Sequence, residues 1–69
     1  MFILKWTNKH SNESGYVESI SVKDKHFVNT FDKAKAKIYK SASVAKRMIS
    51  NLNSYGEAEN NVFEIVSVK

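Results

Sequence analysis

The chain has 69 residues, no cysteine and a formal net charge of +4. A chain of this length predicts one domain, residues 1–69, with a small core and no room for a deep cleft. The absence of cysteine excludes disulfide staples and fits a reducing compartment, so we expect a cytoplasmic protein. The N-terminal MFILKWT interrupts its apolar run at Lys5 and therefore predicts neither a signal peptide nor a membrane span.

Residues 2–7 alternate in polarity, with Phe2, Leu4 and Trp6 on one side, which predicts a strand whose aromatic face is turned inward. Residues 8–15, NKHSNESG, are rich in Asn, Ser and Gly, which favour turns, and they predict a long hairpin loop. We therefore expect the chain to open with the first arm of a β-hairpin.

Residues 16–22 predict the second strand of this hairpin, with Ile20 and Val22 on one face. Glu18 falls on that apolar face, so it lies either at a sheet edge or at a slip in the strand register. The charged residues 23–25 predict a turn after the strand.

Residues 26–39 fit two periods. Helical spacing relates Phe27, Phe31, Ala34 and Ile38, whereas alternation with lysine fits a strand that has one lysine-covered face. We prefer a turn near residues 29–33 and a short third strand over 35–39, because a helix continuing into residue 41 would put the next apolar arc out of phase. A lysine-lined strand also suits a sheet edge, where charge discourages pairing with other chains.

Residues 41–56 carry the clearest period of the sequence. One arc at helical spacing holds the apolar side chains Val44, Ala45, Met48, Ile49 and Leu52. Ser41 or Ser43 provides an N-cap, and Asn53 and Gly56 suit a left-handed C-terminal turn. The segment therefore predicts an amphipathic helix of about three turns over residues 41–55.

Residues 62–68 predict a last strand with apolar side chains on both faces, as in a central strand or a strand buried against a partner. The elements assemble as βββαβ, a two-layer α+β fold in which the helix covers one face of a small, mostly antiparallel sheet. A helical crossover places the last strand beside the first and parallel to it, which gives the strand order 4-1-2-3.

The predicted core contains the inward residues of the strands and of the helix: Leu4, Trp6, Ile20, Val22, Ile38, Val44, Ala45, Met48, Ile49, Leu52, Phe63 and Ile65. The second face of the sheet stays open in this arrangement, and a further set of apolar residues is expected to line it: Ile3, Val17, Val62, Val66 and Val68. An open apolar face of this kind predicts a homodimer or a partner surface.

The positive charge is regional. The stretch from residue 33 to 56 holds six bases and no acid, and the remainder holds five bases and seven acids, so +6 here is offset by −2 elsewhere. The six bases are Lys33, Lys35, Lys37, Lys40, Lys46 and Arg47. They form either a solvated face that keeps the protein soluble or a candidate surface for an anionic partner.

The sequence predicts no enzyme, no cofactor, no metal and no small-molecule substrate. The two histidines, His10 and His26, lack the spacing of metal ligands, and there is no cysteine to join them. There is no Gly-rich phosphate loop and no nucleophile motif. Glu57 and Glu59 are close in sequence, but a solvated connector is expected there because no apolar pocket is implied that would raise a carboxyl pKa.

Several stretches carry a resemblance: Trp6, Gly15-Tyr16-Val17, residues 36–41 leading into Ala45, and the closing residues 63–68. In this arrangement the chain resembles small uncharacterised proteins of phages and prophages of low-GC Gram-positive bacteria. The abundance of Lys, Asn, Ser and Ile agrees with that source. The resemblance implies an accessory gene product and assigns no site.

Two function classes follow. The first is a small module that binds a protein, either from a host or a second copy, through its open sheet face or by strand addition at an edge. The second is a nonspecific nucleic-acid-binding protein in which the basic stretch 33–47 neutralises phosphates and Tyr39 or Tyr55 stacks on a base. A single arginine among eleven bases disfavours base-specific readout, and the first class is preferred.

Overall fold

The computed structural model describes residues 1–56 and 59–68. Within these ranges the chain forms four strands, one α-helix and a 3-10 turn over residues 33–35. In chain order they are β1 (Phe2–Asn8), β2 (Ser14–Ser21), β3 (His26–Thr30), η1 (Lys33–Lys35), α1 (Ala42–Ser54) and β4 (Asn61–Ser67). The predicted α+β fold with βββαβ order is confirmed.

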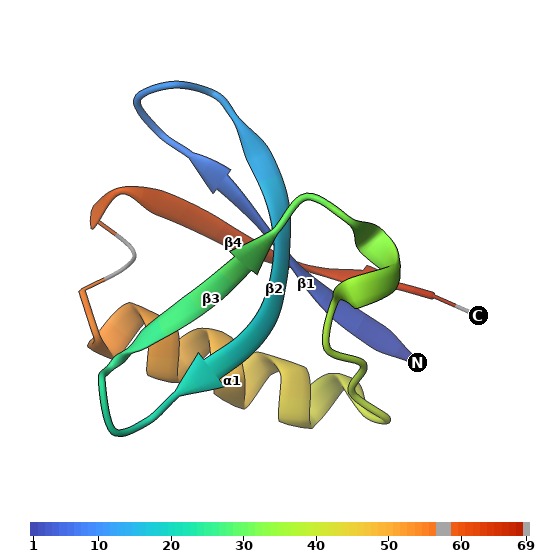
Figure 1. Cartoon of the computed structure of the whole chain (residues 1–69). Coiled ribbons are helices and arrows are strands. Elements are labelled where there is room, and N and C mark those ends of the chain that lie inside the picture. The colour runs from blue at the N-terminus through green and yellow to red at the C-terminus, as the bar shows by residue number, and fades with distance from the viewer. Residues whose placement is uncertain (57–58, 69) are drawn as a thin grey trace.

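The strands form one antiparallel sheet in the order β3-β2-β1-β4, which is the predicted order 4-1-2-3 counted from the other edge. The helix α1 contacts β1 and β4 and covers one face of the sheet, as predicted (Figure 1). We call this the core face, and the opposite one the open face. Met1 and Val68 lie side by side where β1 begins, since the Val68 amide donates to the Met1 carbonyl at 2.8 Å.

The predicted hairpin loop after β1 is present. The Asn8 Oδ1 atom accepts hydrogen bonds from the backbone amides of His10 and Ser11 at 2.9 and 3.0 Å. Asn12 adopts a left-handed conformation with φ of 62°, which asparagine tolerates better than most residues. The turn-forming residues therefore hold this loop through their own backbone and side-chain hydrogen bonds.

Trp6 lies across Gly15, its register partner on β2. The indole Nε1 donates to the Tyr16 carbonyl at 3.1 Å, which satisfies the polar atom of a ring that is only 6% exposed. A Cβ at Gly15 would lie 2.8 Å from both the Trp6 Cζ2 atom and the Thr30 carbonyl oxygen. This position therefore requires glycine for close approach.

The strand register slips at Glu18, one of the two alternatives that the sequence left open. A bulge between Val17 and Ser19 interrupts the pairing of β2 with β3. Cross-strand pairing of β2 with β1 extends over residues 14–16 only, so the two strands part after Tyr16. The Val17 carbonyl instead accepts a hydrogen bond from the Lys37 amide at 3.0 Å.

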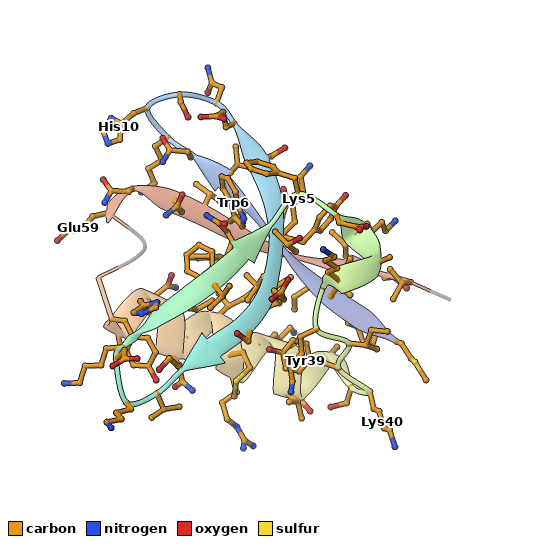
Figure 2. The ribbon with its side chains drawn as sticks, viewed as in Figure 1. Lys5, Trp6, His10, Tyr39, Lys40 and Glu59 are labelled. Carbon is orange, nitrogen blue, oxygen red and sulfur yellow. The ribbon has the colours of Figure 1, made fainter. Side chains whose placement is uncertain are left out.

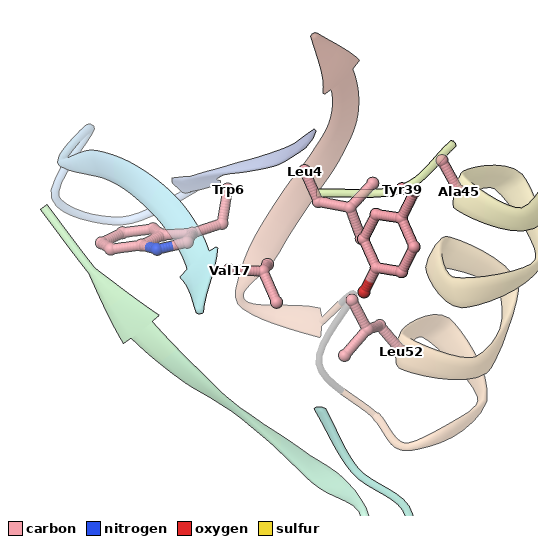
Figure 3. Close-up of a cluster of buried hydrophobic side chains, with 6 residues drawn as sticks. All are labelled: Leu4, Trp6, Val17, Tyr39, Ala45 and Leu52. Carbon is pink, nitrogen blue, oxygen red and sulfur yellow. The ribbon is translucent and has the colours of Figure 1, made fainter. Parts of the chain in front are cut away.

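Tyr39 occupies the gap that β2 leaves beside β1. Its amide and carbonyl exchange two hydrogen bonds with Phe2, at 2.7 and 2.8 Å, in an isolated antiparallel bridge. Its ring is 7% exposed and packs in the core with Leu4, Ala45 and Leu52 (Figure 3). Burial raises the pKa of the Tyr39 hydroxyl above the ordinary value of 10.0, because desolvation disfavours the phenolate.

The prediction of a third strand over residues 35–39 is wrong. The third strand is β3, residues 26–30, and residues 33–35 form the 3-10 turn η1. The Asp32 carboxylate caps this turn by accepting from the Ala34 amide at 2.9 Å. The alternation of Ala and Lys misled the prediction because most of residues 31–38 are exposed on all sides, and only Ala36 is buried.

The last strand runs antiparallel to β1, so the predicted parallel arrangement is also wrong. The chain crosses the molecule once more than predicted. After β3, residues 31–40 return to the beginning of β1, and α1 then runs toward the hairpin end of the sheet (Figure 1). The final strand must therefore run back toward the chain's start.

The helix α1 confirms the predicted boundaries closely. Ser41 is the N-cap, with its Oγ accepting from the Val44 amide at 3.3 Å, and Gly56 takes the left-handed conformation with φ of 86° after the helix. Ala45 and Leu52 are fully buried. The side chains packed around the cluster of buried residues are Phe2, Ile20, Phe27, Met48, Ile49, Tyr55, Phe63 and Ile65.

Three predicted core residues are exposed: Val22 at 70%, Ile38 at 56% and Val44 at 38%. Val22 falls in the turn after β2, beyond the end of the strand at Ser21, so the alternation that would put it on the face of Ile20 no longer applies. The positions that the prediction missed are Ile3, Val17, Ala36 and Tyr39, all of them buried. Of the connector that contains Glu57 and Glu59, Glu57 lies outside the described residues.

We predict that Gly15→Ala lowers the free energy of unfolding by about 2 kcal/mol, because the new methyl group overlaps the indole ring and a backbone oxygen. Urea denaturation followed by tryptophan fluorescence measures the change. Ser14→Ala is the control, since Ser14 is exposed on the same strand. An effect of Gly15→Ala no larger than that of the control would contradict the close approach.

We predict that the free energy of unfolding falls as the pH rises above about 10, and falls less in Tyr39→Phe. The unfolded chain ionises Tyr39 near its ordinary pKa, whereas the folded chain holds the hydroxyl neutral to higher pH. The stabilising contribution is complete below pH 10 and is lost above it. Urea titrations from pH 8 to 11.5 test this, and parallel curves for both proteins would exclude the effect.

Candidate interaction surface

The open face of the sheet carries three rows of cross-strand partners. Partners in an antiparallel pair share a face, so the rows on β1 and β4 are Ile3 with Val66, Lys5 with Glu64, and Thr7 with Val62. Val62 is 51% exposed and Val66 is half-buried. The open face is therefore apolar at its two ends and charged in its middle row.

The returning segment covers part of this face. Ile3 is only 2% exposed, because η1 and Ile38 lie over the beginning of β1. Between this segment and the end of β4 lies a hollow of about 350 Å³, lined by Ile3, Lys33, Ala34, Ile38 and Val68. We call these five residues the hollow. Its floor and walls are aliphatic, and Lys33 is its one charged lining residue.

The predicted apolar partner face is only partly present. Val62, Val66 and Val68 lie on the open face as expected, and Ile3 forms the floor of the hollow. Val17 does not belong to this face: it is fully buried in the core cluster with Leu4 and Leu52. Val17 faces the core because it lies two residues after Gly15, which packs under Trp6 on the core face.

The strand β4 forms one edge of the sheet. The Val68 amide donates to Met1 and the Lys9 amide donates to Asn60, so even-numbered residues of β4 direct their backbone groups toward β1. The backbone groups of Phe63, Ile65 and Ser67 therefore point away from the sheet. No other element of the described chain pairs with this edge.

The edge of β4 is also regular. All seven of its residues pair with β1 in one continuous register, without a bulge, and it contains no proline and no lysine. Charged side chains, bulges and short length are the usual protections of an edge strand. On β4, Glu64 is the one charged residue.

The six predicted basic residues are all exposed, and they lie on two parts of the molecule. Lys33 and its neighbours belong to the returning segment over the open face, whereas Lys46 and Arg47 belong to α1, which packs on the core face. Lys40 precedes Ser41, the N-cap of the helix, and points away from the helix (Figure 2). Among the described residues, none of the six forms an ion pair with a carboxylate.

The described part of the chain contains no candidate metal site. No three side chains of His, Cys, Asp or Glu gather there in a way that would hold a metal ion. His10 lies at the tip of the hairpin loop and points outward, and His26 begins β3 (Figure 2). Of the tyrosines expected to stack on a base, Tyr39 is buried in the core.

Sequence reasoning missed Phe31 as an exposed aromatic residue. It is 67% exposed, and its ring meets the Trp6 ring edge-on, with centroids 5.8 Å apart. Sequence reasoning also placed Ile38 in the core instead of at the rim of the hollow. The local sequence does not reveal where Phe31 and Ile38 lie, because their positions depend on where the returning segment crosses the sheet.

Comparison with known proteins finds no matching family model, no matching curated protein and no matching solved structure. No relative therefore assigns a role to the hollow or to the edge of β4. Among the residues that the structure describes, no helix is both long enough and apolar enough to cross a membrane.

We predict that Ser67→Pro leaves the fold intact, with a loss below about 1 kcal/mol, whereas Glu64→Pro costs more than about 2 kcal/mol. Both side chains are exposed, but the Ser67 amide points to the free edge and the Glu64 amide toward β1. Thermal unfolding followed by circular dichroism measures both. Equal losses in the two variants would contradict the assignment of the edge.

Proposed function

We propose that the protein is a non-catalytic interaction module that binds a protein partner through the free edge of β4 and the adjoining open face. The observation that carries the proposal is the edge of β4, which is continuous in register and has no bulge, no proline and no lysine. An extended segment added at this edge forms main-chain hydrogen bonds with Phe63, Ile65 and Ser67. Its side chains alternate between the core face and the open face.

The other edge of the sheet is less suited to strand addition. The strand β3 has five residues, and it pairs with β2 across a bulge. Lys25, with φ of 56°, stands at its beginning, and Lys23 precedes it in the same turn. Short length, irregularity and lysine all discourage pairing at an edge.

The charge of β4 favours a different protein over a second copy. Glu64 lies at the centre of β4, with three residues on either side. Two copies paired over the whole strand would therefore place Glu64 directly opposite its own equivalent, and like charges in such a pair are destabilising. The proposed partner is a host protein, in keeping with the resemblance to phage and prophage accessory proteins.

A nonspecific nucleic-acid-binding function is the second candidate. The observation in its favour is the set of exposed lysines in the returning segment, none of them paired with a described carboxylate. Any such binding weakens steeply with salt, because each neutralised phosphate releases a counterion. An electrophoretic shift at low and at moderate salt tests it, and the absence of a shift at both would exclude it.

We predict that immobilised wild-type protein retains a protein partner from the lysate of a low-GC Gram-positive bacterium, and that Ser67→Pro retains less of it. The proline removes an edge donor and leaves the ladder to β1 in place. Capture is compared before and after nuclease treatment. The exposed turn variant Val22→Ser is the control for a surface change far from the edge.

Retention that disappears with nuclease would assign the surface to nucleic acid and overturn the proposal. Equal retention by wild type and Ser67→Pro would exclude the edge of β4 as the binding element. Sedimentation of the purified protein tests self-association separately, and a dimer dispersed by Ser67→Pro would replace the host protein with a second copy.

A further inference from the structure

The hollow is an apolar recess with a solid floor. Ile3, at 2% exposure, forms the floor, and Ala34, Ile38 and Val68 form the walls. Its volume of about 350 Å³ is at the lower end of the range of small ligand pockets. Displacing water from these aliphatic side chains with an apolar side chain is favourable.

The surroundings of the hollow are basic. Lys33 lines it, Lys35 and Lys37 follow as exposed residues, and Lys5 lies two residues beyond Ile3 on the same face of β1. The carboxylates near these lysines include those of Glu64, the register partner of Lys5, and of Asp32, which accepts a hydrogen bond from the Ala34 amide. Glu18 adds a third, because it follows Val17, whose carbonyl accepts from the Lys37 amide. Positive charge is therefore in excess around an apolar recess.

The hollow adjoins the free edge of β4. Val68, one of its walls, directly follows Ser67, whose backbone groups point to that edge. A segment that pairs with the edge directs every second side chain to the open face, beside Val66 and Val68. The edge and the hollow can therefore be used by one extended segment.

We propose that the hollow receives an apolar side chain from an acidic, extended segment of the partner protein, whose carboxylates lie beside Lys33. The inference rests on the proposed function and names the chemistry of its partner. The apolar side chain supplies most of the binding free energy through burial, and the carboxylates supply selectivity and rapid encounter.

The lining favours a peptide over a nucleic acid. Base stacking needs the flat face of an aromatic ring, and the hollow is lined by aliphatic residues and one lysine. The exposed Phe31 lies edge-on to Trp6 and does not line the hollow. The one arginine lies on α1, which packs on the opposite face of the sheet.

The test uses a short fluorescein-labelled peptide with one leucine between glutamates, and fluorescence anisotropy with the full chain. We expect Ile38→Ser and Lys33→Glu each to weaken binding by about tenfold. The matched controls are Val22→Ser and Lys23→Glu in the turn between β2 and β3, which lies at the other end of the molecule from η1 (Figure 1). The controls are expected to change binding by less than about twofold.

The peptide is varied in the same way. Replacing its leucine by serine removes the apolar anchor, and replacing its glutamates by glutamines removes the charge, so each change should weaken binding to the wild type. Raising the salt concentration should weaken the glutamate peptide and leave the glutamine peptide nearly unchanged. All four protein substitutions are at exposed positions, and thermal unfolding verifies that the variants are folded.

Two results would overturn the inference. One is no binding of the peptide to the wild type, or binding that the hollow variants weaken no more than the controls do. The other is tighter binding of an oligothymidylate that displaces the peptide and is weakened by Lys33→Glu. In either case, loss of partner capture with Ser67→Pro after nuclease treatment would still support the edge of β4, so the two proposals fail independently.

Discussion

The structure depends on the parting of β1 and β2 after Tyr16. A regular hairpin would continue to pair along the whole of β1 and would leave the returning chain outside the sheet. The bulge at Glu18 bends β2 away, and Tyr39 then takes the vacated place beside Phe2 through two backbone hydrogen bonds. The segment between β3 and α1 is thus fixed to the sheet by Tyr39, whose ring lies in the core, and by the hydrogen bond from the Lys37 amide to the Val17 carbonyl.

The same parting determines which surface remains available. To reach Phe2, the returning segment crosses the open face and buries Ile3 beneath η1 and Ile38. It stops short of β4, so a recess remains between the segment and Val68. A chain of about 70 residues buries only about 60% of the surface that its unfolded form exposes, so part of the sheet stays uncovered. The hollow is therefore a consequence of how the chain returns.

The sequence predicted the features that are encoded locally. The caps of α1 at Ser41 and Gly56, the hairpin loop and the alternation of β1 each depend on residues within a few positions of one another. It did not predict features that depend on distant segments. The bridge of Tyr39 to Phe2 joins residues far apart in the chain, and one additional crossing of the molecule reversed the direction of β4. Ile38 lies at the rim of the hollow instead of in the core for that reason.

Glu64 limits which strands can pair with the edge of β4. An edge strand that is apolar on both faces exposes the protein to uncontrolled pairing, and a charge in its centre penalises the fully overlapped pairing with itself. A strand from a different protein can still pair with this edge, provided that the residue it places opposite Glu64 is not acidic. Acidic residues of such a segment then belong near Lys33, beyond the end of β4. Glu64 therefore disfavours pairing with a second copy, and Lys33 favours a partner segment that is acidic beyond the end of β4.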